Sequence, residues 1–259
     1  MIPLQPDWLT HIAEVLMLVS TRLLGFFLVM PLFAFRASPL RLRVVLALVL
    51  ALGLTPLVNA RAVPSLVLTP GYAMVGLELM IGMAGGFLVR VGLMAVDVLA
   101  ELLSIQSGLS FAVTYSHDPA LSSGLMGELL GLVTLAIAFA MNIHLLMLEV
   151  LMDSFRVLPF GVWPGQWQLD AVVRLIQDSF VLGLVLSLPA IAVYWLFNMT
   201  QSMLARVSPQ MNLFSIGFSV MIPVAFVVIA FMLPAFPDIM LRALEEPMRL
   251  LRAGLNAES

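Results

Sequence analysis

Cysteine and lysine are absent from this chain of 259 residues, and charged residues make up only 10% of it. The lack of cysteine excludes disulfides, thiolate metal sites and a cysteine nucleophile. All twelve basic residues are arginine, and the formal net charge is −3. A nucleic-acid-binding protein would carry a basic patch or stripe, and the sequence has no basic run. The sequence therefore predicts no nucleic-acid partner.

Apolar residues, by contrast, make up 62% of the chain, well above their share in soluble domains. They gather in long runs that favour membrane helices. The runs cover residues 12–35, 44–58, 72–105, 125–152, 180–197 and 213–236. We expect a single all-α domain over residues 1–259, made of integral membrane-type helical hairpins with broken and kinked helices.

Ionisable residues interrupt these runs. A charge in the hydrocarbon of a membrane costs about 2.5–3.5 kcal/mol on insertion scales, so such residues normally face protein or water. We therefore expect a polar-cored membrane assembly, with more interior charges than one chain pairs by itself. The residues concerned are Glu14, Arg22, Glu78, Asp97, Glu101, Glu128 and Glu149.

The run 72–105 is longer than a bilayer requires, whereas the run 44–58 is shorter. The long run either continues as one helix or folds back near Arg90. A fold-back would put most arginines on one side of the membrane, as the positive-inside rule favours. The stretch Leu88–Gly92, however, carries no proper turn signal. We therefore expect one continuous helix that tilts, kinks at its glycines or packs against protein.

The sequence contains no motif of a zinc protease, a phosphate-binding loop or a serine hydrolase. His144 fits either a hydrogen-bonded interior histidine or a metal ligand, and the lack of ligand spacing to His11 and His117 favours the first. Asp97 and Glu101, four residues apart, share one helix face. They fit either a proton relay or a water-facing stripe near a helix end.

Residues 106–124 form a polar, small-residue loop between two unusually long apolar runs, with Phe111 and Tyr115 inside it. Loops of this length are usually functional or disordered. Non-helical backbone at membrane depth is tolerated only against protein or a water-filled cavity. We expect a functional element here, with a periplasmic connector as the alternative.

The stretch Arg206-Val-Ser-Pro-Gln-Met-Asn-Leu-Phe-Ser-Ile-Gly217 is the most specific pattern. Its polar residues do not face lipid together, so we expect this helix break to be buried in protein or wet. These residues are Arg206, Pro209, Gln210 and Asn212. The pattern resembles the Arg-x-x-Pro-Gln-x-Asn-x-Phe-x-x-Gly signature of the FliR family, the flagellar type III export-gate membrane proteins and their virulence-secretion counterparts.

The likeness to this family extends over nearly the whole chain. The chain departs from the family at Ile143, where a glycine is frequent, and at Met221, where a lysine is frequent. The matching residues elsewhere are, in chain order, Arg22, Gly25, Pro31, Pro39, Arg41, Arg43, Glu78, Gly82, Gly86, Asp118, Pro119, Ser154, Phe155, Pro159 and Gly161.

The resemblance implies a non-enzymatic subunit of a protein-export channel, without cofactor or metal. It implies assembly with FliP-type and FliQ-type membrane subunits, beside an FlhB-type gate subunit and flagellar rod components. The assembly would lie in the bacterial inner membrane within the flagellar basal body, largely above the bilayer plane, and export unfolded axial proteins. The resemblance also implies that the central loop is a pore plug, with Phe111, Tyr115, His117, Asp118 and Pro119 as its residues.

Other classes of protein make different predictions. A virulence-secretion export gate is the sister alternative. A secondary transporter also has broken helices and midplane charges, but it predicts internal inverted repeats, and the Arg206 pattern has no counterpart in the N-terminal half. An intramembrane enzyme needs a nucleophile–base pair or a paired-aspartate motif that the sequence does not show.

Overall fold

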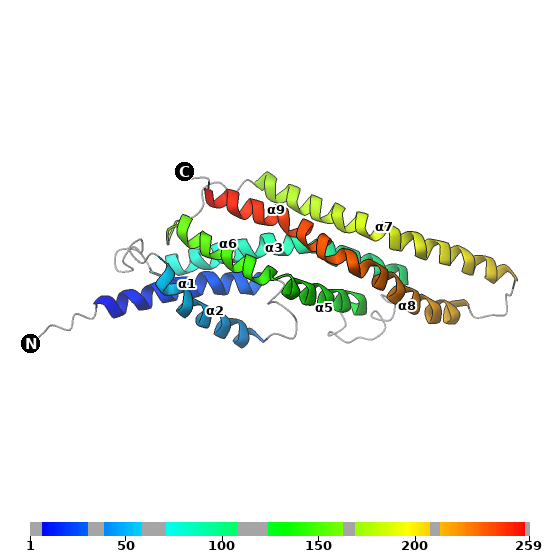
Figure 1. Ribbon diagram of the computed structural model, residues 1–259, viewed down its shortest axis with the longest axis horizontal. Helices are drawn as coiled ribbons and strands as arrows, with labels where there is room; N and C mark the ends of the chain where they lie inside the picture. Colours follow the sequence, from blue (N-terminus) through cyan, green and yellow to red (C-terminus); the bar gives the residue numbers. More distant parts are fainter. Residues whose placement is uncertain are drawn as a thin grey trace, which may run out of the picture. The chain divides into compact units, whose positions relative to one another are not determined.

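The regular structure of this protein is helical wherever the computed structural model describes it, namely residues 7–30, 39–58, 71–107, 124–162, 169–207 and 213–256 (Figure 1). No strand occurs in these ranges, which confirms the all-α prediction. The helices are α1 Asp7–Val29, α2 Leu40–Leu54, η1 Thr55–Leu57, α3 Gly71–Ser107, α5 Gly124–Ala140, α6 Ile143–Val157, α7 Leu169–Val207, α8 Leu213–Met232, η4 Leu233–Ala235 and α9 Phe236–Asn256.

The chain divides into two compact units. Unit 1 comprises Met1–Gly92, Asn142–Leu175 and Leu244–Ser259, and unit 2 comprises Leu93–Met141 and Ile176–Ala243. The helices α3, α7 and α9 contribute residues to both units. The expectation of a single domain over residues 1–259 stays a prediction.

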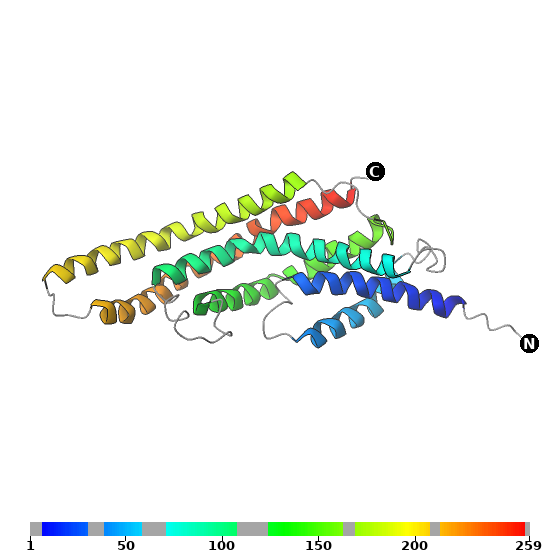
Figure 2. The ribbon, with the colours of Figure 1, turned by 180° about the vertical axis from the view of Figure 1, so that it is seen from behind.

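In unit 1, α1 lies against α2 and α3 (Figures 1 and 2). Glycines on α3 allow its backbone to approach that of α1. A Cβ atom at Gly82 would meet the carbonyl oxygen of Arg22, and one at Gly86 would lie 2.6 Å from the carbonyl oxygen of Phe26. Close packing against α1, one of the alternatives for this long helix, therefore occurs at two of its glycines.

Unit 2 has its own apolar core, to which the C-terminal part of α3 and helices α5, α7, α8 and α9 contribute. Tyr194 and Phe236 are among its fully buried side chains. Helix α7 approaches α3 closely as well, because a Cβ atom at Gly183 would lie 2.5 Å from the carbonyl oxygen of Ala95.

The structure confirms one continuous helix over the run 72–105, since α3 extends without a break from Gly71 to Ser107. The run 125–152, predicted as a single segment, is broken at Met141–Asn142 into α5 and α6. Asn142 has a φ of 57°, and asparagine is one of the few non-glycine residues that tolerate this left-handed conformation. The break therefore needs neither glycine nor proline.

The described residues contain four helical stretches long and apolar enough to cross a membrane: Thr10–Val29, Gly71–Ser107, Leu169–Leu204 and Val220–Arg252. The expected short run 44–58 corresponds to α2, whose 15 residues would extend about 22 Å at 1.5 Å per residue. That length is shorter than the hydrocarbon core of a bilayer, which is about 30 Å thick.

Candidate functional site

An arginine on α1 is the largest fully buried side chain of the chain's described part. Arg22 has no exposed surface, although it lies on an apolar helix. An arginine remains charged when buried, so it must be compensated by protein groups. Its neighbours come from α3 and from the end of α6, and together they form what we call the Arg22 cluster. The cluster consists of Arg22, Glu78, Ser154, Phe155, Leu158, Phe160 and Gly161.

The carboxylate of Glu78 on α3 neutralises this arginine. Arg22 Nε donates to Glu78 Oε2 at 2.6 Å, and both side chains are 0% exposed. The other carboxylate oxygen, Oε1, accepts a hydrogen bond of 3.0 Å from the backbone N–H of Gly161. The φ of +80° at Gly161 belongs to the left-handed region, which suits a residue without a Cβ atom. Glu78 therefore holds both Arg22 and the turn after α6.

The remaining nitrogens of Arg22 bind the C-terminal end of α6. Nη1 donates to the carbonyl oxygen of Ser154 at 3.0 Å and to its hydroxyl oxygen at 3.3 Å, and Nη2 donates to the carbonyl oxygen of Leu158 at 3.5 Å. The last carbonyls of a helix carry partial negative charge. A cation contributed by α1 therefore stabilises the end of α6.

Two aromatic rings cover the guanidinium. Its carbon lies 4.6 Å from the centroid of the Phe155 ring and 5.5 Å from that of Phe160. Both distances are within the range of a cation–π contact. The centroids of the two rings lie 5.9 Å apart, and both side chains are buried, so the rings exclude water from the ion pair. Exclusion of water strengthens the pair and makes the loss of either partner costly.

The geometry of this cluster is that of a joint between helices. Every polar group of Arg22 and Glu78 named above is bonded within the protein, and both side chains are inaccessible to solvent. The cluster thus presents no exposed acid, base or nucleophile to a substrate. It ties α1, α3 and the turn after α6 together within unit 1.

The other residues singled out in the sequence lie elsewhere. Asp97 and Glu101 are exposed on the unit 2 part of α3. Three further ionisable residues are exposed on α5, α6 and α7; they are Glu128, Glu149 and Arg206. Glu14 on α1 is half-buried. The plug residues and three polar residues of the Arg206 pattern lie outside the described residues; they are Phe111, Tyr115, His117, Asp118, Pro119, Pro209, Gln210 and Asn212.

Two of the interior charges pair within the chain, because Arg22 and Glu78 neutralise each other. The expectation that the whole set of charges exceeds what one chain pairs by itself stays a prediction. The sequence did not indicate the pairing of Arg22 with Glu78, because the two residues are separated by 56 positions. The family-like residues Ser154, Phe155 and Gly161 were the available signal. These residues match the family pattern, but the pattern does not indicate which residues they contact.

Histidine and carboxylate side chains do not form a metal site in the described part of the chain, where no group of three or more potential ligands occurs. His144 lies near the start of α6 and is partly buried. The alternatives for Asp97 and Glu101 are a proton relay and a water-facing stripe, and their exposure favours the stripe.

Residues 13–246 match the sequence profile described as "Bacterial export proteins, family 1". The chain is 28% identical over 222 residues to the "Flagellar biosynthetic protein FliR" of Escherichia coli (strain K12), covering 85% of this chain and 82% of that protein. The protein of the same name from Caulobacter vibrioides is 28% identical over 203 residues, covering 77% and 80% of the two chains.

A third relative has the same name. The "Flagellar biosynthetic protein FliR" of Bacillus subtilis (strain 168) is 24% identical over 218 residues, covering 82% of this chain and 83% of that protein. The profile match spans most of the sequence and includes all residues of the Arg22 cluster. The chain therefore belongs to family 1 of the bacterial export proteins.

Proposed function

We propose that this chain is a structural and channel subunit of the flagellar type III protein export gate, needed for flagellum assembly and for export of unfolded axial proteins. The observation that carries the proposal is the match of residues 13–246 to an export family whose relatives named above are flagellar biosynthetic proteins. These names favour the flagellar system over the virulence-secretion alternative.

The Arg22 cluster supports a structural role in place of an enzymatic one. Family-like residues from three separate stretches, Arg22, Glu78 and Ser154–Gly161, meet at this buried joint. Their side chains and backbone groups are used in holding helices together. We propose that the chain acts by its shape within an assembly and catalyses no reaction.

The partners in this proposal are FliP-type and FliQ-type membrane subunits, an FlhB-type gate subunit and flagellar rod components, in the bacterial inner membrane. Large apolar side chains are exposed on α2 and α7, and we propose that subunit contacts cover much of this surface. The surface-exposed carboxylates Asp97, Glu101, Glu128 and Glu149, together with the Arg206 pattern, are proposed to contribute to assembly.

The central loop, residues 106–124, is proposed to close the export channel. Its serines and glycines permit tight folding, and Phe111 and Tyr115 supply bulk. Asp118-Pro119 ends the loop rigidly, because proline fixes its own φ and restricts the residue before it. A plug that opens must be held by a free energy of only a few kcal/mol.

Deletion of the gene tests the proposed function. We expect the deletion strain to lose swimming and to stop secreting flagellar axial proteins, and a plasmid copy of the chain to restore both. Immunoblots of axial proteins in the culture medium and in the cells measure export. Normal secretion by the deletion strain would contradict the proposal, and a specific loss of solute uptake would favour the transporter alternative.

A further inference from the structure

Helix α3 keeps one narrow face uncovered within unit 1. The exposed residues along this face follow one another at alternating intervals of three and four positions. We call this face the α3 strip; it consists of Ala73, Gly76, Met80, Met83, Phe87 and Arg90. Intervals that alternate between three and four residues match the contact line between two helices that pack along their length.

The other sides of α3 are occupied in this unit. Glu78 belongs to the Arg22 cluster, and Gly82 and Gly86 lie against the backbone of α1. Leu88 and Val91 are buried and pack with Leu175 of α7. The strip is therefore the side of α3 that the described residues of unit 1 leave exposed to another molecule.

The strip is mostly apolar but ends in a charge. Met80 is 58% exposed and Phe87 is 44% exposed. Arg90, which follows about one turn later, is exposed as well and carries a positive charge. No described residue forms an ion pair with Arg90, whereas Arg22, Arg156 and Arg249 each pair with a carboxylate. The charge of Arg90 does not suit lipid tails, and the apolar side chains before it do not suit water.

A partner helix with a carboxylate would cover the apolar residues of the strip and neutralise the charge of Arg90. Ala73 and Gly76 allow close approach of another backbone, as small residues do between membrane helices. The unbranched side chains of Met80 and Met83 adapt to the surface they meet. An aspartate or glutamate opposite Arg90 would form a paired, charge-assisted hydrogen bond.

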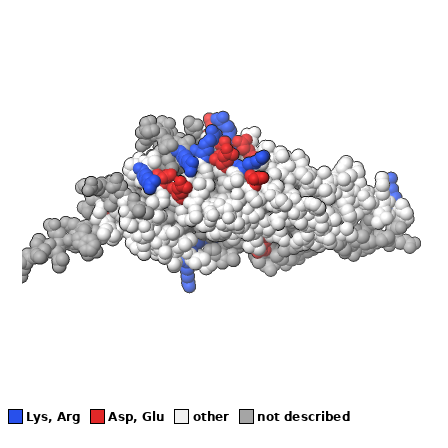
Figure 3. Space-filling model, viewed as in Figure 1, with Lys and Arg blue, Asp and Glu red and all other residues white. Residues whose placement is uncertain are grey.

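We propose that a helix of another export-apparatus subunit docks lengthwise on the α3 strip, with a carboxylate against Arg90. This inference rests on the proposed function and specifies one surface for it. Charged residues elsewhere occupy a different setting, since Figure 3 shows side chains of both signs next to one another on one face. On α9, for example, Glu246 and Arg249 form an exposed ion pair. Such a mixed surface suits water.

Charge reversal at Arg90 tests this docking. In cells that make the whole export apparatus, Arg90→Glu should lower the recovery of co-purified membrane subunits with the tagged chain at least tenfold, whereas Arg90→Lys should retain most of it. Arg174→Glu, at another exposed arginine of unit 1, is the matched control and should keep wild-type recovery. A carboxylate-to-arginine change in a partner subunit that restores recovery and motility to Arg90→Glu would identify the facing residue.

Crosslinking tests the same surface without altering charge. Because the chain has no native cysteine, Met83→Cys or Phe87→Cys carries one photoreactive label at one defined place. We expect both labels to form adducts with a second protein of different mass. Adducts with lipid or with a second copy of this chain would overturn the proposal, as would wild-type recovery with Arg90→Glu. Loss of export in the deletion strain is measured separately, so a docking failure leaves the proposed function standing.

Discussion

At the scale of single residues, the Arg22–Glu78 pair governs the stability of unit 1. Removing one partner of a buried ion pair leaves an uncompensated charge and typically costs about 3–5 kcal/mol. We expect Arg22→Ala to lower the free energy of unfolding in detergent by this amount. Arg156→Ala is the control, since it removes an exposed pair with Asp153 and should cost about 0–1 kcal/mol.

Replacing both buried partners distinguishes the charge from the packing. The double variant Arg22→Met with Glu78→Leu leaves no charge unpaired, so it should be more stable than Arg22→Ala. Thermal unfolding followed by circular dichroism compares the variants. Equal losses in the single and double variants would mean that the packing around Phe155, and not the ion pair, sets the stability.

The sequence indicated which residues belong to this site, but it did not indicate which of them contact one another. Arg22 and Glu78 were singled out as charges that must avoid lipid, and both are buried. Their mutual pairing depends on the approach of α1 to α3, which no local pattern encodes. The carbonyl groups of Ser154 and Leu158 are backbone atoms, so residue type gives no signal for them.

At the scale of helices, glycine determines how closely α1 and α3 approach. A side chain at Gly82 would collide with the backbone of Arg22, which cannot rotate away. We expect Gly82→Leu to lower the free energy of unfolding by about 1–3 kcal/mol, as overpacked side chains do, and to lower the yield of folded protein. Gel filtration in detergent and thermal unfolding measure the effect.

Gly76 on the same helix provides the matched control. A Cβ atom there would meet nothing within 4 Å. Because glycine destabilises a helix interior relative to alanine, Gly76→Ala should stabilise α3 by about 0.5–1 kcal/mol. If Gly76→Ala and Gly82→Leu lowered the free energy of unfolding by similar amounts, close approach of α1 would not be the reason for a glycine at position 82.

The course of helices was predictable where local chemistry decides it. The stretch Leu88–Gly92 lacks a turn signal, and α3 is continuous through it. The break at Asn142 was not predictable, because a single left-handed asparagine inside an apolar run resembles an ordinary polar interruption. The apolar run 180–197 predicted only part of α7, which extends over 39 residues. The two ends of α7 contain polar residues, so they do not belong to an apolar run.

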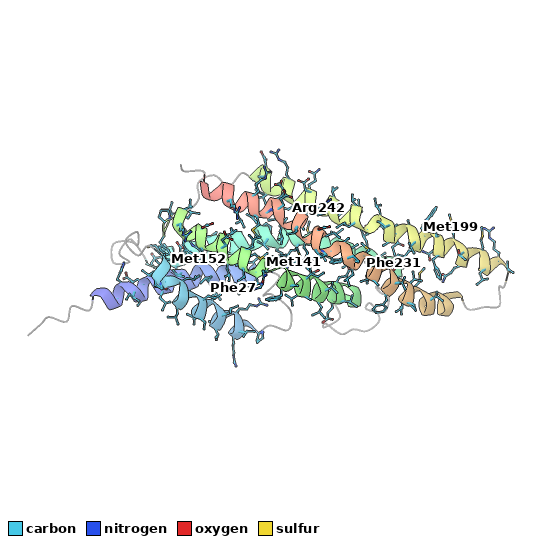
Figure 4. The ribbon with its side chains drawn as sticks, viewed as in Figure 1. Phe27, Met141, Met152, Met199, Phe231 and Arg242 are labelled. Atoms are coloured by element: carbon cyan, nitrogen blue, oxygen red, sulfur yellow. The ribbon has the colours of Figure 1, made fainter. Side chains whose placement is uncertain are left out.

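At the scale of the whole molecule, many large apolar side chains of the described residues are exposed. Met199 on α7 and Phe231 on α8 are examples; Phe231 is 82% exposed (Figure 4). Such surface associates with lipid or protein. We expect the chain to be heterogeneous when purified alone and to give a single species when produced together with the proposed FliP-type and FliQ-type subunits. Light scattering after gel filtration measures both, and a monodisperse, thermally stable monomer would contradict this expectation.

The plug proposal also concerns the whole channel. Deleting residues 110–115 should leave the complex assembled but make the inner membrane permeable to ions or small solutes. Removing residues 61–66 from another connection shortens the chain equally and serves as the control. Leak is measured in cells that produce the partner subunits as well. An assembled deletion complex as tight as the wild type would assign the loop to the connector alternative.

The long sequence separations within the Arg22 cluster also set an order of events during synthesis. Ser154, which binds Arg22, lies 132 positions after it. At about 5–20 residues per second, a ribosome needs roughly 7–26 s to cover that distance. Throughout this interval the nascent α1 carries a charge whose partners at the end of α6 do not yet exist. Since unit 1 also includes part of α9, this unit is complete only after α9 has been made.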